Sequence, residues 1–336
     1  MTDSNEGNAG ERKPVILITG ATGLLGAQIA RMASSGNSAS RVLVATRRAA
    51  PPKIGPRPAP DVVPMDLACD VVEVPRGVDA LIHAAGEKRD ESRMTAVNAV
   101  GTLRLAEAAA RAGVRRFVYV SSVGVYGAAS HSGLLSESHA HRPRNAYESS
   151  KHSGEVHLRD VGARTGMDFV ILQPTNVIGT VRGRHYPLLG LMRMIRDGYF
   201  TWFGHFDACA NYVAVEDVAS AVLASVSHAP SGRAYIINTP APLSAVVAWI
   251  AEELGARFPQ RHLPLWAGRV AALLGSAIGG LSGRTMPIDR ERLQALTSTT
   301  QYDPSYFMKL ARHEYPLGIQ AAIRALVRSY RGDGLL

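Results

Sequence analysis

The chain has 336 residues, of which 46% are hydrophobic and 19% are charged, so it holds enough apolar material for one large domain or two modest ones. Its formal net charge is +9, but the arginines are scattered along the whole chain and form no basic cluster interleaved with aromatic residues, so nucleic-acid binding is not expected. Only two cysteines occur, far apart and outside any metal-ligand spacing, so neither a disulfide framework nor a metal site is expected.

The first elements in chain order predict the fold class. Residues 1–13 are polar, which predicts a disordered N-terminus without a signal peptide and hence a cytoplasmic protein. From Pro14, short β-branched runs alternate with alanine-rich helical runs; the expected strands include VILITG, RVLVATR, DALIHAAG, RFVYVSS and DFVILQP. Strands without polar alternation are buried on both faces, as in a parallel sheet covered by helices. We therefore expect an α/β fold with a Rossmann-like, doubly wound parallel sheet.

The alternation fades from about residue 176, which predicts two regions. Residues 14–175 form the expected dinucleotide-binding Rossmann domain, to which residues 207–240 return in part. Residues 176–206 and 241–336 form a smaller C-terminal substrate-binding region. Within it, apolar residues between 263 and 281 recur at helical spacing, interrupted by Arg269 and by glycines, which favours a packed amphipathic helix over a membrane-surface one and argues against an integral membrane span. These residues are Trp266, Val270, Leu273, Leu274, Ala277, Ile278 and Leu281.

A glycine-rich turn lies between the first expected strand and the first expected helix. The segment ITGATGLLG contains Gly20, Gly23 and Gly26 at intervals of three residues. Such a turn lets backbone amides approach a pyrophosphate, and the N-terminus of the helix favours its negative charge. The position of this turn at the start of an α/β alternation predicts dinucleotide binding, with Thr22, Leu24 and Leu25 as further contacts.

The end of the second strand indicates which dinucleotide binds. A site for NAD usually has an acidic residue there for the ribose diol, whereas a site for NADP has an arginine for the 2′-phosphate. The strand ends in VATRRAA, so Arg47 and Arg48 stand where an acidic residue would be expected. NADP(H) is therefore the favoured cofactor, with NAD(H) as the alternative.

The segment AYESSK places Tyr147 and Lys151 four residues apart on an expected helix, so both side chains project from one face. A tyrosine acts as a proton donor or acceptor near neutral pH only if its pKa is lowered, and a neighbouring ammonium group together with a cationic nicotinamide has this effect. Lys151 is also one of only five lysines among the 37 lysines and arginines. The pair is therefore a candidate catalytic pair.

Taken in this order, the glycine turn, the segment YVSSVGVYG and the pair in AYESSK resemble the extended short-chain dehydrogenase/reductase superfamily, in its nucleotide-sugar epimerase and reductase branch. The resemblance covers about residues 15–223. It implies that Ser122 positions and polarises the reacting substrate oxygen while Tyr147 exchanges a proton with it. Lys151 would lower the pKa of the phenol and bind the nicotinamide ribose. A homodimer is also implied by the resemblance alone.

The same resemblance assigns further residues along the chain. The implied cofactor contacts are Asp66 and Leu67 at the adenine, Ala84, Ala85 and Gly86 beneath the cofactor, Asn98 as an anchor of that loop, and Pro174 and Val177 at the nicotinamide. The implied substrate contacts are Lys88, Ser122, Asn176, Arg182 and Arg184.

Departures from the family pattern narrow the expected reaction. Val123 and Gly124 follow Ser122, where 4,6-dehydratases carry an acidic pair and 3,5-epimerase/reductases carry a cysteine, so both reactions are disfavoured. Gln173 replaces the arginine that commonly precedes the proline in this branch. Ala210 and Asn211 replace a common Arg-Asp pair, which weakens the assignment to nucleotide sugars.

The expected protein is an NADP(H)-dependent oxidoreductase or epimerase that acts on a hydroxyl or keto carbon, C4, of a nucleotide-linked sugar. Arg47 after the second strand favours a reductase, because it implies NADP(H), the cofactor that usually drives reductions. The alternative enzyme is a reductase of a hydrophobic alcohol or ketone, similar to dihydroflavonol reductases or 3β-hydroxysteroid dehydrogenases, which the apolar helix over 263–281 favours. A non-catalytic nucleotide sensor is the third hypothesis, but the expected triad is intact.

Overall fold

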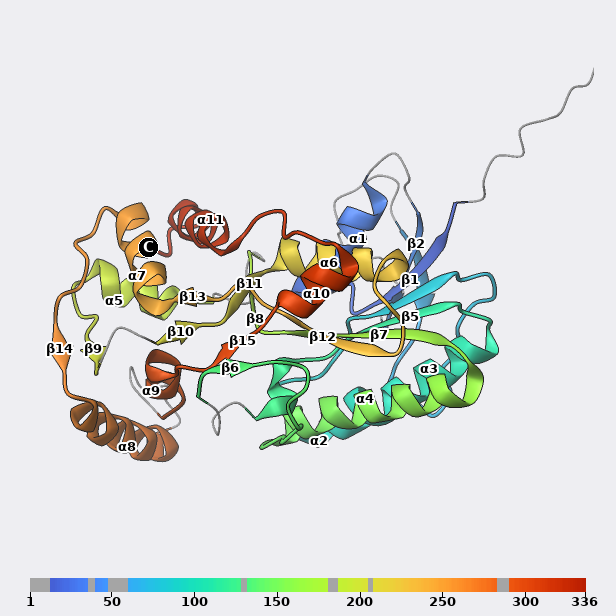
Figure 1. The fold of residues 1–336 in the computed structure, drawn as a ribbon, viewed down its shortest axis with the longest axis horizontal. Helices are drawn as coiled ribbons and strands as arrows, with labels where there is room; N and C mark the ends of the chain where they lie inside the picture. Colours follow the sequence, from blue (N-terminus) through green and yellow to red (C-terminus); the bar gives the residue numbers. More distant parts are fainter. Residues whose placement is uncertain are drawn as a thin grey trace, which may run out of the picture.

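The computed structural model describes residues 13–35, 40–47, 60–127, 132–180, 187–204, 208–282 and 290–336. A seven-stranded sheet forms the larger lobe, with its strands in the order β12-β7-β5-β4-β1-β2-β3 (Figure 1). Every neighbouring pair in this sheet is parallel, so the predicted fold class is confirmed. The strands are β1 (Val15–Thr19), β2 (Arg41–Thr46), β3 (Asp61–Pro64), β4 (Ala80–His83), β5 (Arg116–Val120), β7 (Asp168–Pro174) and β12 (Arg233–Ile237).

Helices cover both faces of this sheet, as Figure 1 shows. Helices α1 (Leu24–Ser34), α6 (Val215–Ser227) and α10 (Ser305–Ala311) share one apolar core with the sheet, and α3 (Gly101–Arg111) and α4 (Ala146–Thr165) share the other. All five residues of β1 and all four of β4 are buried. This burial on both faces explains why the strands carry no polar alternation.

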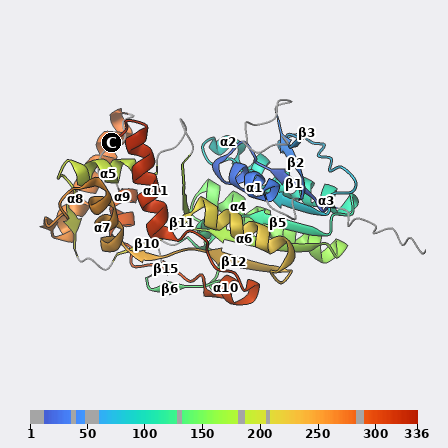
Figure 2. The same ribbon diagram turned by 90° about the horizontal axis from the view of Figure 1, so that it is seen from above.

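The smaller lobe is mostly helical and lies beyond the carboxyl ends of the central strands (Figures 1 and 2). Its helices are α5 (Leu189–Arg196), α7 (Leu243–Leu254), α8 (Leu265–Ser282), α9 (Arg290–Thr297) and α11 (Ile319–Gly332). A separate apolar core joins α5, α7 and α11. Short strand pairs connect the segments: β8 (Asn176–Ile178) with β11 (Tyr212–Ala214), β10 (Cys209–Ala210) with β13 (Ala241–Pro242), β9 (Trp202–Phe203) with β14 (His262–Leu263), and β6 (Leu134–Leu135) with β15 (Gln301–Tyr302).

Phe307 and Asp217 are among the residues that tie the C-terminal segments to the larger lobe. Phe307 on α10 is fully buried in the core beside α6, although the sequence suggests a place in the substrate-binding region for residues 241–336. The buried carboxylate of Asp217 on α6 accepts hydrogen bonds from the backbone amides of Leu317 (2.8 Å) and Gly318 (3.0 Å), directly before α11. The larger lobe therefore holds both α10 and the start of α11.

Helix α8 forms where the sequence predicts it, but its orientation differs from the expectation. Trp266, Val270, Leu273 and Leu274 are exposed, so the prediction that they are packed is wrong. The helix instead packs through Gly268, Ala272 and Gly275, which lie at spacings of four and three residues on one face. A Cβ atom at Gly268 would lie 2.7 Å from the ring of Phe203, so only a glycine permits this close approach.

Candidate active site

The turn from β1 into α1 has the geometry that a phosphate-binding turn needs. Gly20 has a φ of 75°, and a Cβ atom there would lie 2.6 Å from the backbone nitrogen of Ala85. A Cβ atom at Gly26 would overlap the carbonyl oxygen of Gly20. Thr22 and Gly23 are exposed, and no side chain caps the N-terminus of α1. The exposed turn and the uncapped helix start therefore fit an anionic ligand such as the pyrophosphate of a dinucleotide, with Leu24 and Leu25 partly exposed beside it.

The loop after β4 is anchored by Asn98. This buried side chain accepts a hydrogen bond from the backbone nitrogen of Glu87 (2.7 Å) and donates one to its carbonyl oxygen (2.7 Å). Asn98 lies in a π-helical segment (Thr95–Val100) that joins α2 (Glu91–Met94) to α3, a local geometry that is frequent at functional sites. These two bonds keep Ala84, Ala85 and Gly86 close to the glycine turn.

A chain of buried hydrogen bonds under this loop was not predicted from the sequence. The backbone nitrogen of Ala85 donates to Thr19 Oγ1 (3.2 Å), which contacts His83 Nδ1 (2.7 Å). His83 Nε2 contacts Thr102 Oγ1 (3.0 Å), which donates to the carbonyl oxygen of Asn98 (2.7 Å). Burial, with a smaller contribution from the charge of Lys151, lowers the pKa of His83 to about 3. His83 is therefore neutral and has a structural role. In the sequence, only the presence of polar residues within two apolar segments pointed to this network.

Ser122 and Tyr147 meet at the carboxyl end of β5. Asn145 caps α4 by accepting a hydrogen bond from the backbone nitrogen of Glu148 (2.9 Å), which fixes the first turn that carries Tyr147. Ser122 Oγ accepts a hydrogen bond from the backbone nitrogen of Gly124 (3.1 Å), in a short 3-10 helix (Val123–Tyr126). Burial raises the pKa of Tyr147, and the nearby Ser122 side chain opposes this rise. The two side chains therefore lie near each other.

Lys151 lies one turn further along α4 and is almost fully buried. Its Nζ donates a hydrogen bond to the carbonyl oxygen of Val120 (2.8 Å) and lies 4.7 Å from the ring centre of Tyr119. A Cβ atom at Gly86 would lie 3.3 Å from Nζ, so the loop passes directly over the ammonium group. Burial lowers the pKa of Lys151 to about 8, and the charge of Glu155 opposes this change.

The Lys151 ammonium is directed at Val120 and Tyr119 in this structure. The lowering of the Tyr147 pKa by Lys151 together with a bound nicotinamide stays a prediction.

A second buried polar network lies next to Lys151, around Glu155 on the following turn of α4. It was not predicted from the sequence. The fully buried carboxylate of Glu155 accepts hydrogen bonds from Gln173 Nε2 (2.9 Å) and from Arg159 (3.1 Å). Gln173 Oε1 in turn accepts a hydrogen bond from the phenol of Tyr126 (2.7 Å). Gln173 replaces the arginine of the family pattern. Its uncharged amide makes hydrogen bonds through both its nitrogen and its oxygen. The position of Glu155 four residues after Lys151 was the available signal.

The remaining predicted residues are partly exposed, partly buried and partly outside the described residues. Arg47 is exposed at the end of β2, while Leu67 is buried and the carboxylate of Asp66 accepts a hydrogen bond from the backbone nitrogen of Ala68 (3.0 Å). Pro174 is the last residue of β7, and Val177, on β8, packs at the edge of the core beside α6. Lys88 and Asn176 are exposed. Arg48, Arg182 and Arg184, like residues 1–12, lie outside the described residues.

The sheet order, the doubly wound helices and the second lobe define a Rossmann-fold protein, and comparisons with known proteins give its family. The model of the NAD dependent epimerase/dehydratase family matches residues 16–238. The chain belongs to this family and is an enzyme of the extended short-chain dehydrogenase/reductase superfamily.

Individual relatives share modest identity with the chain. An N-acetyl-alpha-D-glucosaminyl-diphospho-ditrans,octacis-undecaprenol 4-epimerase of Escherichia coli O157:H7 is 29% identical over 240 residues, which are 68% of this chain and 70% of the relative. A candidate dihydroflavonol 4-reductase of Synechocystis sp. is 24% identical and covers 86% of each chain. The crystal structure of a UDP-glucuronic acid 4-epimerase from Bacillus cereus in complex with NAD superimposes with a TM-score of 0.67 at 18% identity, covering 94% of this chain and 99% of that one.

Proposed function

We propose that the enzyme uses NADP(H) to transfer hydride at a hydroxyl or keto carbon, C4, of a sugar attached to a nucleoside diphosphate. One observation carries this proposal: Ser122 and Tyr147 lie near each other at the carboxyl end of β5, and Lys151 lies one turn further along α4, beneath the Gly86 loop. Two neighbouring hydroxyl groups can both reach one substrate oxygen.

Each of the three side chains has a distinct proposed role. Ser122, held by the amide of Gly124, donates a hydrogen bond to the reacting oxygen and orients it. Tyr147 donates a proton to that oxygen during reduction and accepts it during oxidation. Lys151 holds a positive charge below the site and would contact the cofactor ribose, together with backbone groups of Ala84 to Gly86. The bound dinucleotide supplies the hydride chemistry at its nicotinamide ring.

The choice of NADP(H) rests on Arg47. Its exposed position at the end of β2 leaves the guanidinium group available for a 2′-phosphate, with Arg48 next in the sequence. Gly20, Gly23 and Gly26 would admit the pyrophosphate, and Asp66 and Leu67 would border the adenine. Purified protein should gain more thermal stability from NADPH than from NADH, and equal gains would refute the preference.

Action at C4 is supported by the names of two relatives, the E. coli 4-epimerase and the Bacillus 4-epimerase. For this chain, Lys88, Asn176, Arg182 and Arg184 are the proposed contacts of the sugar and its diphosphate. The E. coli relative is named for a sugar whose diphosphate carries a polyprenol, so a lipid-linked sugar diphosphate belongs among the substrates to be tested.

The decisive experiment is a substrate panel followed by NADPH absorbance and by product analysis. The panel contains UDP-, GDP- and dTDP-linked sugars and their 4-keto forms, a polyprenol-linked sugar diphosphate, and sterol and flavonoid ketones. Stoichiometric NADPH consumption identifies a reductase, whereas inversion at C4 without net consumption identifies an epimerase. Turnover of none of the sugars would reject the proposal.

Reduction of an apolar ketone is the second candidate function. It is favoured by the likeness to the Synechocystis protein, which extends over 86% of each chain and thus includes the smaller lobe. Turnover of flavonoid or sterol ketones alone in the same panel would support this candidate over the first.

The oligomeric state and the location are also proposals. We expect a homodimer, as the superfamily resemblance implies, and the exposed Val156 on α4 offers apolar surface for such a contact. A cytoplasmic location is proposed separately, from the sequence composition. Light scattering coupled to gel filtration measures the subunit number.

A further inference from the structure

Helix α8 turns its large apolar side chains away from the protein. Trp266 is 68% exposed, Val270 49%, Leu273 50% and Leu274 60%. The opposite face, with Gly268, Ala272 and Gly275, is buried against the protein. A surface helix usually places its large apolar side chains toward the core, because burial removes them from water. Among the described residues, the reversed arrangement leaves the face formed by these four side chains without a covering segment, which marks an interaction surface.

The segment of the sequence that contains this apolar face is rich in positive charge. Between residues 255 and 288 the sequence contains four arginines and one histidine, but no aspartate or glutamate. Arg257 and Arg261 precede the helix, Arg269 lies on it, and all three are exposed. Large apolar residues, including a tryptophan, beside arginines are the composition of helices that lie in the plane of an anionic membrane surface.

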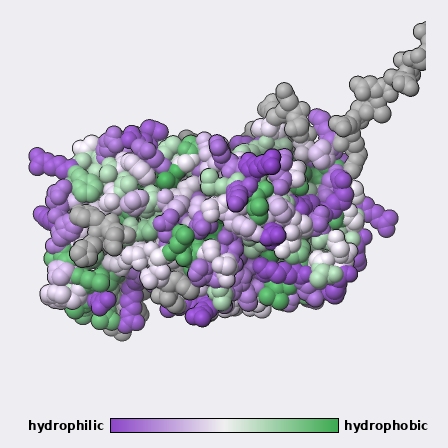
Figure 3. Space-filling view, in the orientation of Figure 1, coloured by the Kyte–Doolittle hydropathy of each residue, from purple (hydrophilic) through white to green (hydrophobic). Residues whose placement is uncertain are grey.

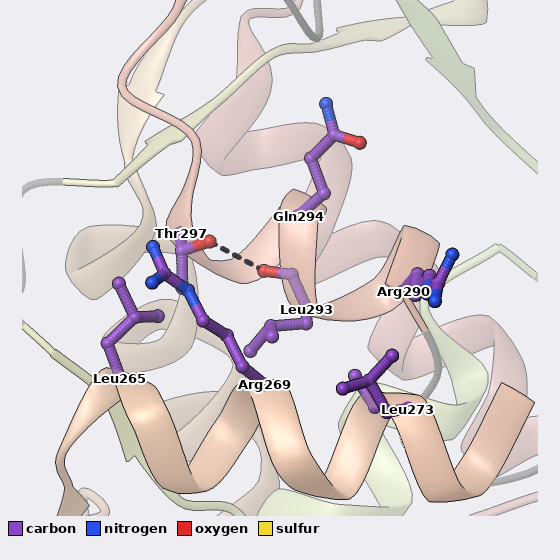
Figure 4. A pocket seen from close by; sticks show the side chains of 8 residues that line it. Leu265, Arg269, Leu273, Arg290, Leu293, Gln294 and Thr297 are labelled. Carbon is purple, nitrogen blue, oxygen red and sulfur yellow. Dashed lines mark hydrogen bonds between the residues drawn. The ribbon is translucent and has the colours of Figure 1, made fainter.

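A groove between α8 and α9 borders the same face and shares Leu273 with it. Its volume is about 380 Å³, and Leu265, Ala272, Leu273 and Leu293 supply its apolar wall. Figure 4 shows Arg269 on α8 and Arg290 by the start of α9 on opposite sides of this groove. An apolar trough with guanidinium groups at its margins matches a phospholipid, whose acyl chain is apolar and whose phosphate is anionic.

We propose that the exposed face of α8, defined by Trp266, Val270, Leu273 and Leu274, docks on the surface of a bilayer that contains anionic phospholipid. Figure 3 shows apolar surface at the lower left of the view, where Figure 1 places α8. A second copy of the chain is a poorer occupant, because pairing through the same face would bring the arginines of both copies together. The proposal does not depend on the proposed substrate.

In the described part of the chain, no helix is long and apolar enough to cross a membrane.

Vesicle flotation tests this proposal directly. The full-length protein is mixed with vesicles of phosphatidylcholine alone or with about one third phosphatidylglycerol, at low and high salt. We expect flotation with the anionic vesicles and weaker flotation at high salt, since added ions screen the arginines. The tryptophan emission should shift to shorter wavelength on binding, and a Trp266→Phe variant should lose most of this shift while Trp202 and Trp249 remain.

Two variants and a matched control locate the surface. The double variant Leu273→Ser, Leu274→Ser should lower the partition coefficient at least about tenfold, because it removes two large apolar side chains from the contact. Arg269→Glu should weaken binding to anionic vesicles only. Val71→Ser, at an equally exposed apolar residue in the larger lobe, should float like the unchanged protein. Circular dichroism and the melting temperature show whether each variant is folded.

The contrary outcomes are distinct. Absence of flotation of the unchanged protein, or equal loss in Val71→Ser, would overturn the proposal. A change from dimer to monomer in the folded Leu273→Ser, Leu274→Ser variant would assign the face to a second copy instead. Because flotation is measured without substrate or cofactor, its failure is separate from failure of the proposed function.

Discussion

The two lobes bury apolar side chains by different means. In the larger lobe, the strands of a parallel sheet lie between two layers of helices, and residues such as Leu17, Leu81 and Phe117 are fully buried. In the described part of the smaller lobe, α8 packs through one side, and it presents the small residues Gly268, Ala272 and Gly275 there. The difference teaches that an apolar pattern predicts the element, whereas its orientation depends on how closely the partner approaches.

The largest expected effect tests whether the polar residues at the edge of the larger lobe perform chemistry. Tyr147→Phe should reduce turnover by about 10²- to 10⁴-fold, because the proton donor is removed while the ring remains. Dinucleotide binding, measured by fluorescence titration, should change little. Tyr199→Phe, in the smaller lobe, is the matched control because Tyr199 is exposed. Near-normal turnover of Tyr147→Phe would mean that another group donates the proton.

The next prediction compares close packing in the two lobes. Gly26→Ala should lower the free energy of unfolding by about 1–3 kcal/mol and weaken dinucleotide binding, because the new methyl group overlaps the Gly20 carbonyl. Gly190→Ala on α5 meets no atom within 4 Å and should be neutral or stabilising by up to about 1 kcal/mol. Urea unfolding measures both values. Equal effects of the two changes would contradict the described packing of β1 against α1.

Lys151→Met tests the cost of burying an ammonium group in the larger lobe. The pKa of Lys151 is about 8 in the folded protein, against an ordinary value of 10.5, so between these values the unfolded state binds more protons. Stability contributed by this group therefore rises with pH above about 8, by about 2 kcal/mol from pH 7.5 to 9.5, and the variant should lack this rise. Urea unfolding of both proteins at the two pH values measures the difference, and parallel pH dependences would show that Lys151 is not buried as described.

The smallest effect concerns the cofactor. Arg47→Ser should weaken NADPH binding about tenfold, the loss of one charge-assisted contact, and leave NADH binding unchanged. Arg111→Ser, on the exposed end of α3, removes the same charge elsewhere and should affect neither dinucleotide. Isothermal titration measures the four affinities. If both dinucleotides respond equally to Arg47→Ser, the arginine has no selective role.

The role of Ser122 beside Tyr147 was expected from the family resemblance and stays a prediction. The strands of the sheet and the helix that carries Tyr147 follow from local patterns, because each depends on residues near in sequence and on one repeated topology. The networks of His83 and Glu155 do not, because their partners come from segments 18 to 64 residues away. Which face of α8 packs against the protein could not be predicted either, because the need for a glycine at position 268 arises from its contact with the distant Phe203. In the described part of the chain, the residues least accessible to prediction are thus those whose role is set by a distant segment.

The two hydrogen bonds from Leu317 and Gly318 to Asp217 bear on how the molecule moves. They connect the start of α11 in the smaller lobe to α6, which packs on the central sheet, through a carboxylate that is buried away from water. A hinge motion of the smaller lobe that carried α11 with it would have to stretch or break these two hydrogen bonds, so they resist such a motion.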